Sequence, residues 1–106
     1  MPTPSELPLS QLKDPSLLKT DALINGQWAK GASRFDILDP SNGRKLADVA
    51  NLGSADAEAA IASANAAWPA WRGKTAKERS IIMRKWFDLL MANQEDLARI
   101  MTAEQG

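Results

Sequence analysis

The chain has 106 residues, the length of one small domain or of part of a larger one, and its 13 basic and 13 acidic side chains leave no net charge. A balanced charge argues against generic binding to nucleic acid or to anionic membranes. The absence of cysteine and histidine excludes a thiolate metal site, a cysteine nucleophile and the commonest general base within these residues.

The composition is that of a folded chain, with 44% hydrophobic residues. No apolar run approaches the roughly 18 residues of a membrane-spanning helix. Residues 1–6 lack the basic and apolar regions of a secretory signal peptide. We therefore expect a cytoplasmic location and no membrane or nucleic-acid partner.

The first 20 residues contain four of the six prolines. This composition predicts a flexible N-terminal arm over residues 1–20. One helical turn is expected after Asp14, because Pro15 suits the first position of a helix.

Residues 22–50 are predicted to form short β-hairpins. Residues 25–26 are Asn-Gly between two apolar runs, and both central residues of a type I′ turn need positive φ. Residues 35–37 alternate, residues 39–43 are dense in turn formers, and residues 46–50 continue in an extended pattern. Hairpins of this size are marginal alone, so the β unit needs a partner surface.

Helical spacing begins at Ser54, which suits an N-cap. The stripe consists of Ala57, Ile61, Ala64, Trp68 and Trp71. Pro69 predicts that this helix covers residues 54–68, because the residue before a proline avoids the α region. Trp71 is then expected in a tight turn.

Two further helices are predicted over residues 75–92 and 94–105. Thr75 and Glu78 match a capping box, in which each side chain accepts a hydrogen bond from the backbone of the other residue. Residues 93–96 form a second helix start, and Gly106 suits the left-handed residue that follows a helix.

The helix over residues 75–92 has an unusually wide apolar face, which spans about 200° at 100° per residue. Its members are Ile82, Met83, Trp86, Phe87, Leu89, Leu90 and Met91. The opposite face carries an i,i+4 pair, Arg84 with Asp88, and Ile81 lies on that charged side. Because a surface helix needs a stripe of little more than 100°, we expect packing on two sides and, for the isolated chain, self-association or loose packing.

Glu104 ends an apolar stripe near the negative end of the last helix, where an anion is unfavourable. Two interpretations are open. The carboxylate lies in water at a frayed helix end, or it accepts hydrogen bonds from chain beyond Gly106.

No residue is predicted to be catalytic, to bind a cofactor or to bind a metal. Asp36, Asp39 and Asp48 lie among the strands without a spacing that brings two carboxylates together, so they are interpreted as solvated. Of the four tryptophans, Trp28 is expected to be partly exposed. The other three, Trp68, Trp71 and Trp86, are expected to pack in a core.

Several segments together resemble the N-terminal portion of the aldehyde dehydrogenase superfamily. They are residues 23–28 (LINGQW), 39–43 (DPSNG) and 67–72 (AWPAWR). Residues 74–79 and 95–106 are most similar to the succinate-semialdehyde or glutarate-semialdehyde dehydrogenases within it. The likeness covers residues 20–106.

This resemblance implies a longer α/β parent, with a Rossmann-like NAD(P)-binding domain, a catalytic domain and an oligomerisation segment. It implies thiolate attack on an aldehyde, hydride transfer to NAD(P)+ and hydrolysis by water that a glutamate activates. In such enzymes the cysteine, the glutamate, an oxyanion-holding asparagine and a cofactor-binding lysine all follow the part that this chain covers. Members usually continue with Lys-Pro after the Glu-Gln-Gly found here at residues 104–106, and no site residue is carried over to this chain.

The implied chain is an α+β fragment, with residues 21–106 forming the N-terminal part of the NAD(P)-binding domain. Its parent would be a cytoplasmic homo-oligomer that oxidises succinate semialdehyde to succinate in 4-aminobutyrate degradation. The fragment is expected to bind no cofactor and to be inactive, and the rest of the parent chain is its expected partner. The alternative is a free-standing helical interaction module whose partner-binding surface is the apolar face of the helix 75–92.

Overall fold

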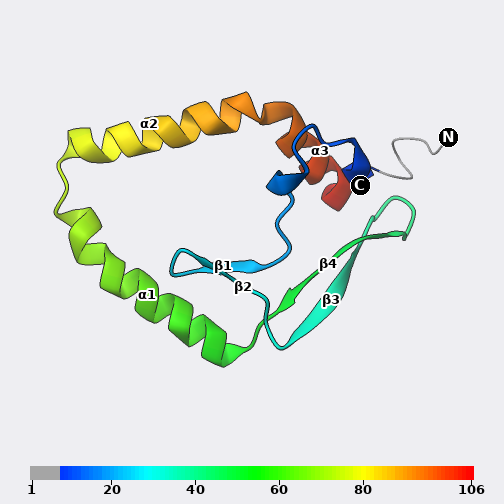
Figure 1. The fold of residues 1–106 in the computed structure, drawn as a ribbon, viewed down its shortest axis with the longest axis horizontal. Helices are drawn as coiled ribbons and strands as arrows, with labels where there is room; N and C mark the ends of the chain where they lie inside the picture. The colour runs from blue at the N-terminus through cyan, green and yellow to red at the C-terminus, as the bar shows by residue number, and fades with distance from the viewer. Residues whose placement is uncertain (1–7) are drawn as a thin grey trace.

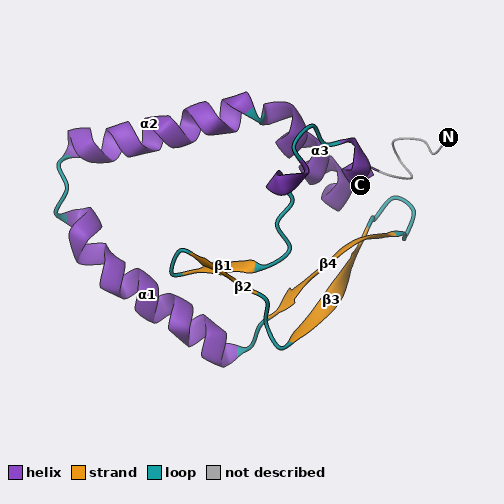
Figure 2. Ribbon diagram, viewed as in Figure 1, coloured by secondary structure: helices purple, strands orange, loops and turns teal. Residues whose placement is uncertain are grey.

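The structure, a computed structural model, describes residues 8–106. Two 3-10 helices come first, η1 (Pro8–Gln11) and η2 (Pro15–Leu17). The strands are β1 (Ala22–Ile24), β2 (Gln27–Ala29), β3 (Ser33–Leu38) and β4 (Lys45–Asn51). The helices are α1 (Ser54–Arg72), α2 (Ala76–Ala92) and α3 (Gln94–Gln105). Figure 2 shows the predicted order of hairpins followed by three helices, which is confirmed.

The two hairpins form separate antiparallel sheets, β1 with β2 and β3 with β4. In the first, Ile24 pairs with Gln27, so Asn25 and Gly26 make a two-residue turn. Their φ values are 53° and 72°, as a type I′ turn requires, which confirms the prediction. In the second, the register shifts between Ile37 and Leu38.

The turn between β3 and β4 is built around Asp39. This carboxylate accepts hydrogen bonds from the backbone N–H of Ser41 at 2.8 Å and from its hydroxyl at 2.7 Å. The two bonds hold the pKa of Asp39 below its ordinary value. Asp39 is only 4% exposed, so the interpretation of this residue as solvated is wrong. The Asp39 carboxylate accepts hydrogen bonds from Ser41 in the same turn in place of hydrogen bonds from water.

The α1 helix differs from its prediction at both ends. Gly53, rather than Ser54, is the N-cap, and its N–H donates to the Asp56 carboxylate at 3.1 Å. The helix continues past Pro69 to Arg72, so the predicted end at residue 68 and the tight turn are wrong. A proline has a helical φ, so the chain can continue as helix through Pro69, although the residue lacks the N–H that would bond to the carbonyl four residues earlier. The Gly73 N–H still donates to the Pro69 carbonyl at 2.9 Å.

The N-cap of α2 and the C-terminal end of α3 follow the prediction, whereas Asn93 makes no side-chain bond that caps the start of α3. The Glu78 N–H donates to the Thr75 hydroxyl at 3.1 Å, and the Thr75 N–H donates to the Glu78 carboxylate at 3.0 Å. The backbone bond from Thr75 is the main reason that the pKa of Glu78 is lowered. Gly106 has a φ of 81°, and its N–H donates to the Thr102 carbonyl at 2.9 Å. α2 therefore begins, and α3 ends, on local signals.

Within the described residues, the N-terminal arm is ordered where the sequence predicts flexibility. Residues 8–20 include η1, which packs on α3, and η2, whose N-cap Asp14 accepts a hydrogen bond from the Ser16 N–H at 3.1 Å. The helical turn expected there is confirmed. The arm is held because its Leu12 side chain is buried and its backbone donates to α3. Residues 1–7 of the predicted arm lie outside the described residues.

The elements surround an open ring and do not stack in layers (Figure 1). The radius of gyration is 17.1 Å, whereas a compact domain of this length has about 13 Å. The extents are 53 × 34 × 19 Å. Within the described residues, the buried apolar side chains are those of Leu12 and Ala103. Residues 8–106 therefore have almost no core of their own.

Candidate functional site

The most prominent surface of the chain is the apolar face of α2. Every residue from 81 to 92 is exposed, and Trp86 and Leu89 are 58% and 64% exposed. The exposed side chains of this predicted face are those of Ile82, Met83, Trp86, Phe87, Leu89, Leu90 and Met91. We call this set the α2 face. Its exposure shows that nothing in residues 8–106 supplies the two-sided packing that the sequence predicts.

The surface area of the whole chain supports the same conclusion. A compact protein of this mass exposes about 5,800 Å², whereas this chain of 11.5 kDa exposes 8078 Å². Trp68 is 50% exposed, so the prediction that Trp68 and Trp86 pack in a core is wrong within this chain. Trp71 is partly buried, and the partial exposure predicted for Trp28 is confirmed at 49%. An apolar surface this large is typical of an interface.

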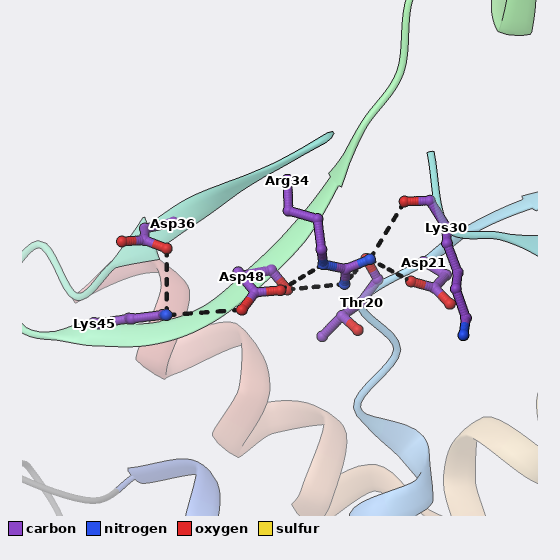
Figure 3. Close-up of polar contacts among 7 residues, drawn as sticks. All are labelled: Thr20, Asp21, Lys30, Arg34, Asp36, Lys45 and Asp48. Atoms are coloured by element: carbon purple, nitrogen blue, oxygen red, sulfur yellow. Dashed lines mark hydrogen bonds and ion pairs between the residues drawn. The ribbon is translucent and has the colours of Figure 1, made fainter. Parts of the chain in front are cut away.

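The second cluster is centred on Arg34 of β3 (Figure 3). Its guanidinium donates to Asp48 of β4 and, at 2.8 Å, to Asp21, which precedes β1. It also donates to the backbone carbonyls of Thr20 and Lys30, each at 3.3 Å. The Ala50 N–H donates to the same Thr20 carbonyl at 2.9 Å. Arg34 therefore joins the ends of the β1–β2 hairpin to the β3–β4 sheet.

Electrostatics favour the charged forms in this cluster. Hydrogen bonds from Arg34 to Asp21 and then Asp48 raise the pKa of the guanidinium, and Arg34 in turn lowers the pKa of Asp48. Lys45 adds ion pairs at 3.4 Å to Asp36 and 3.7 Å to Asp48. Asp36 and Asp48 face each other across the sheet, and Lys45 offsets the repulsion that like charges have in such a pair.

The cluster positions backbone, and it also brings two carboxylates together, because Asp36 and Asp48 are register partners that share Lys45. The prediction that no spacing brings two of these carboxylates together is therefore wrong. The sequence interpretation of Asp36 and Asp48 as solvated residues missed their cationic partners. Arg34 and Asp36 lie two residues apart on β3 and so share a face, and Asp48 lies opposite Asp36. The charge cluster could therefore have been predicted only with the pairing of Asp36 and Asp48, which the sequence does not give.

In residues 8–106 no group of three or more histidine, cysteine, aspartate or glutamate side chains could hold a metal ion. None of the described helices combines the length and the apolar character that a membrane-spanning helix needs. Glu104 lies exposed near the end of α3, beside Met101, which is 65% exposed. This exposure leaves both interpretations of Glu104 open.

Comparison with known proteins decides the family. The sequence profile of the Aldehyde dehydrogenase family matches residues 28–106. The chain belongs to this family. It is 50% identical over 98 residues to the NADP(+) succinate-semialdehyde dehydrogenase of Escherichia coli, covering 91% of the chain and 20% of that enzyme. It is 46% identical to a glutarate-semialdehyde dehydrogenase of Pseudomonas putida, with the same two coverages.

Solved structures of aldehyde dehydrogenases agree in fold. A succinate-semialdehyde dehydrogenase of Burkholderia pseudomallei is 47% identical with a TM-score of 0.84, over 88% of this chain and 20% of that one. An NADP dependent enzyme of Escherichia coli is 49% identical with a TM-score of 0.87, over 91% and 20%. This chain therefore spans about one fifth of the length of the relatives that it matches.

Proposed function

We propose that the chain is the N-terminal segment of an NAD(P)-dependent succinate-semialdehyde dehydrogenase. The observation that carries this proposal is the 50% identity to one fifth of such an enzyme. The α2 face supports it, because an apolar surface without cover in residues 8–106 fits a segment of a larger core. In this role residues 21–106 open the NAD(P)-binding domain and support it from the flank.

The substrate class follows from the names of the relatives. They act on succinate semialdehyde, glutarate semialdehyde and, in a Pseudomonas putida enzyme 47% identical to this chain, 3-sulfolactaldehyde. Each of these molecules has an aldehyde at one end and an anionic group at the other. We therefore infer a small anionic aldehyde as substrate of the parent, with succinate semialdehyde favoured by the 50% identity. The proposed parent is a cytoplasmic homo-oligomer that serves 4-aminobutyrate degradation.

NAD or NADP would supply the hydride acceptor of that enzyme. The residues of this chain do not fit a site for it, since they contain no glycine-rich phosphate loop. Nor do they contain the cysteine nucleophile that the family uses. The proposed contribution of the chain is therefore mechanical, and no chemical step is assigned to it.

A chimeric enzyme tests the proposal. The matching fifth of the Escherichia coli enzyme is replaced by this chain, and NADPH formation is measured with succinate semialdehyde. We expect a folded, active chimera. Trp86→Asp in the chimera should abolish activity, because a charge on a packed α2 face costs at least about 3 kcal/mol of stability. Lys85→Asp, the same change on the charged side, should leave activity in place. A soluble but inactive chimera would contradict the proposal.

The second candidate is the helical interaction module, which the exposure of the α2 face also favours. An amphipathic helix of a partner would then cover the face. In that case the chimera would be inactive even when it folds. Trp86→Asp would instead remove binding of the partner by the 106-residue chain.

A further inference from the structure

Both hairpin turns of this chain contain the dipeptide Asn-Gly. They are Asn25-Gly26, between β1 and β2, and Asn42-Gly43, between β3 and β4 (Figure 2). Asparagine is a chemically labile residue, and a following glycine favours loss of its amide, because no Cβ hinders attack by the glycine nitrogen on the asparagine Cγ. All four residues are exposed to solvent. Each turn is therefore a candidate site for this reaction.

The two glycines have equivalent steric surroundings. The φ value is 72° at Gly26 and 71° at Gly43. Beyond its chain neighbours, a Cβ added at either position would have no heavy atom within 4 Å. Steric access to the reacting nitrogen therefore does not distinguish the two sites.

Hydrogen bonds do distinguish them, because they engage the reacting groups of the β3–β4 turn. The Gly43 N–H donates to the Asp39 carbonyl at 2.7 Å. The side-chain oxygen of Asn42 accepts a hydrogen bond from the Arg44 N–H at 2.9 Å. The bonds from Ser41 to the Asp39 carboxylate fix the same turn. The attacking nitrogen and the amide that it must reach are both held in place.

The β1–β2 turn leaves the same groups without such bonds. Its ladder pairs Ile24 with Gln27, on either side of the two turn residues. Within residues 8–106, no hydrogen bond engages the Gly26 N–H or the Asn25 side chain. Asn25 is also the one residue other than glycine with a positive φ in this part of the chain, at 53°. That conformation costs free energy for a residue that has a Cβ.

We propose that Asn25 is a site of spontaneous deamidation and that its β3–β4 turn protects Asn42. The Gly26 nitrogen gives its proton to solvent and bonds to Cγ of Asn25, and the side-chain nitrogen takes up a proton and leaves as ammonia. Water then opens the cyclic imide. Attack at Cγ gives aspartate, and attack at the main-chain carbonyl gives isoaspartate, whose main chain runs through Cβ and Cγ. Water is the only other reactant.

The isoaspartate product changes the β1–β2 hairpin. It adds a carbon atom to the main chain of a two-residue turn, and the type I′ geometry that holds Ile24 opposite Gln27 is lost. The cross-strand pair of Leu23 and Trp28 then loses its alignment. The aspartate product keeps the turn, because aspartate tolerates a positive φ. This inference goes beyond the proposed function and does not depend on it.

The test compares both sites in one sample of the 106-residue chain. The chain is held at physiological pH and temperature, and samples taken at intervals are digested with trypsin, which separates the sites onto residues 20–30 and 35–44. Mass spectrometry measures the conversion of amide to acid in each peptide. We expect Asn25 to convert about fivefold faster than Asn42, because a hydrogen bond must break before Gly43 reacts. In concentrated urea the two rates should be equal. Equal rates in buffer, or a faster reaction at Asn42, overturn the proposal.

A variant tests the cause of the difference. The bonds that protect Asn42 join residues at most four apart, so the comparison depends on a local turn and not on a rigid ring. Asp39→Ala removes the acceptor for Ser41 and should raise the rate at Asn42 toward that at Asn25, with Asn25 unchanged. Asp88→Ala, on α2, should alter neither rate. An unchanged rate at Asn42 in Asp39→Ala would show that the turn does not protect this residue and would overturn the proposal.

Discussion

Single side chains in this molecule act mainly by holding backbone. Asp39 and Asp96 accept hydrogen bonds from main-chain N–H groups, and Arg34 donates to main-chain carbonyls. Each fixes a segment that lacks regular secondary structure. A backbone group that is removed from water needs such a partner, and these side chains supply it.

These carboxylates give the chain a defined acid response. The pKa values of Asp39, Asp48 and Asp96 are lowered in the folded chain by their hydrogen bonds. Their contribution to stability is therefore fully present above the ordinary aspartate value of 3.8. It is lost as the pH falls from there through the lower folded values. We expect circular dichroism to report unfolding only below about pH 4.

Asp96→Asn provides the control for this acid response. It should weaken the dependence on pH in that range, because the side chain no longer titrates. Loss of structure between neutral pH and about pH 5 would contradict the assignment.

Residue-level prediction succeeds mainly where both partners are close in sequence. The box of Thr75 with Glu78 and the turn at residues 25–26 could be predicted because three residues or fewer separate the partners. Asp39 and Ser41 are equally close, but the interpretation of Asp39 as solvated is wrong, because the sequence does not show how deeply a turn is buried. Arg34 meets Asp21 and Asp48 across 13 and 14 residues, and Asp96 meets Lys13 across 83. No local sequence pattern predicts contacts between residues so far apart. The contacts of Arg34 and of Asp96 were therefore not predicted.

At the scale of elements, the helices show which sequence signals dominate. α2 and α3 lie where the sequence predicts them. α1 continues past its predicted end. The residue before a proline only disfavours the α region, and the last turn of α1 overrides that preference at Trp68. The wide apolar face of α2 could also be predicted, but the residues that would pack against it could not. A sequence shows how much apolar surface needs burial and does not show which residues bury it.

Pro69 gives a prediction at this scale. Pro69→Ala restores an N–H in the last turn of α1 and should raise the free energy of unfolding by about 1 to 3 kcal/mol. Urea unfolding followed by circular dichroism measures the change. Pro40→Ala, in the β3–β4 turn, is the matched control and should lower stability by about 0.4 to 1 kcal/mol. Equal effects of the two variants would show that the helical position of Pro69 has no energetic cost.

For the whole molecule, the open ring and the α2 face have a consequence in solution. A chain with so little burial should self-associate through apolar surface. Sedimentation of the isolated 106-residue chain should therefore depend on its concentration. Trp86→Lys together with Leu89→Lys should shift it toward monomer, because both side chains belong to the α2 face. Lys77→Gln together with Lys85→Gln, on the charged side, should not.

A different behaviour of the isolated chain in solution would contradict this prediction. A monomer with one sharp, cooperative thermal transition would indicate that the described elements suffice for a stable fold. The α2 face would then need no further cover, and its exposure would no longer support a segment of a larger core.

The distance in sequence between Lys13 and Asp96 also bears on the order of folding. Lys13 and Asp96 are 83 residues apart, and a contact that closes so long a loop forms late, because the chain entropy is lost before the contact is gained. The capped helices and the two-residue turn can form from neighbouring residues alone. Synthesis, which runs from the N-terminus, therefore delivers Lys13 well before Asp96. Residues 12–14 wait for their binding site and find their place late.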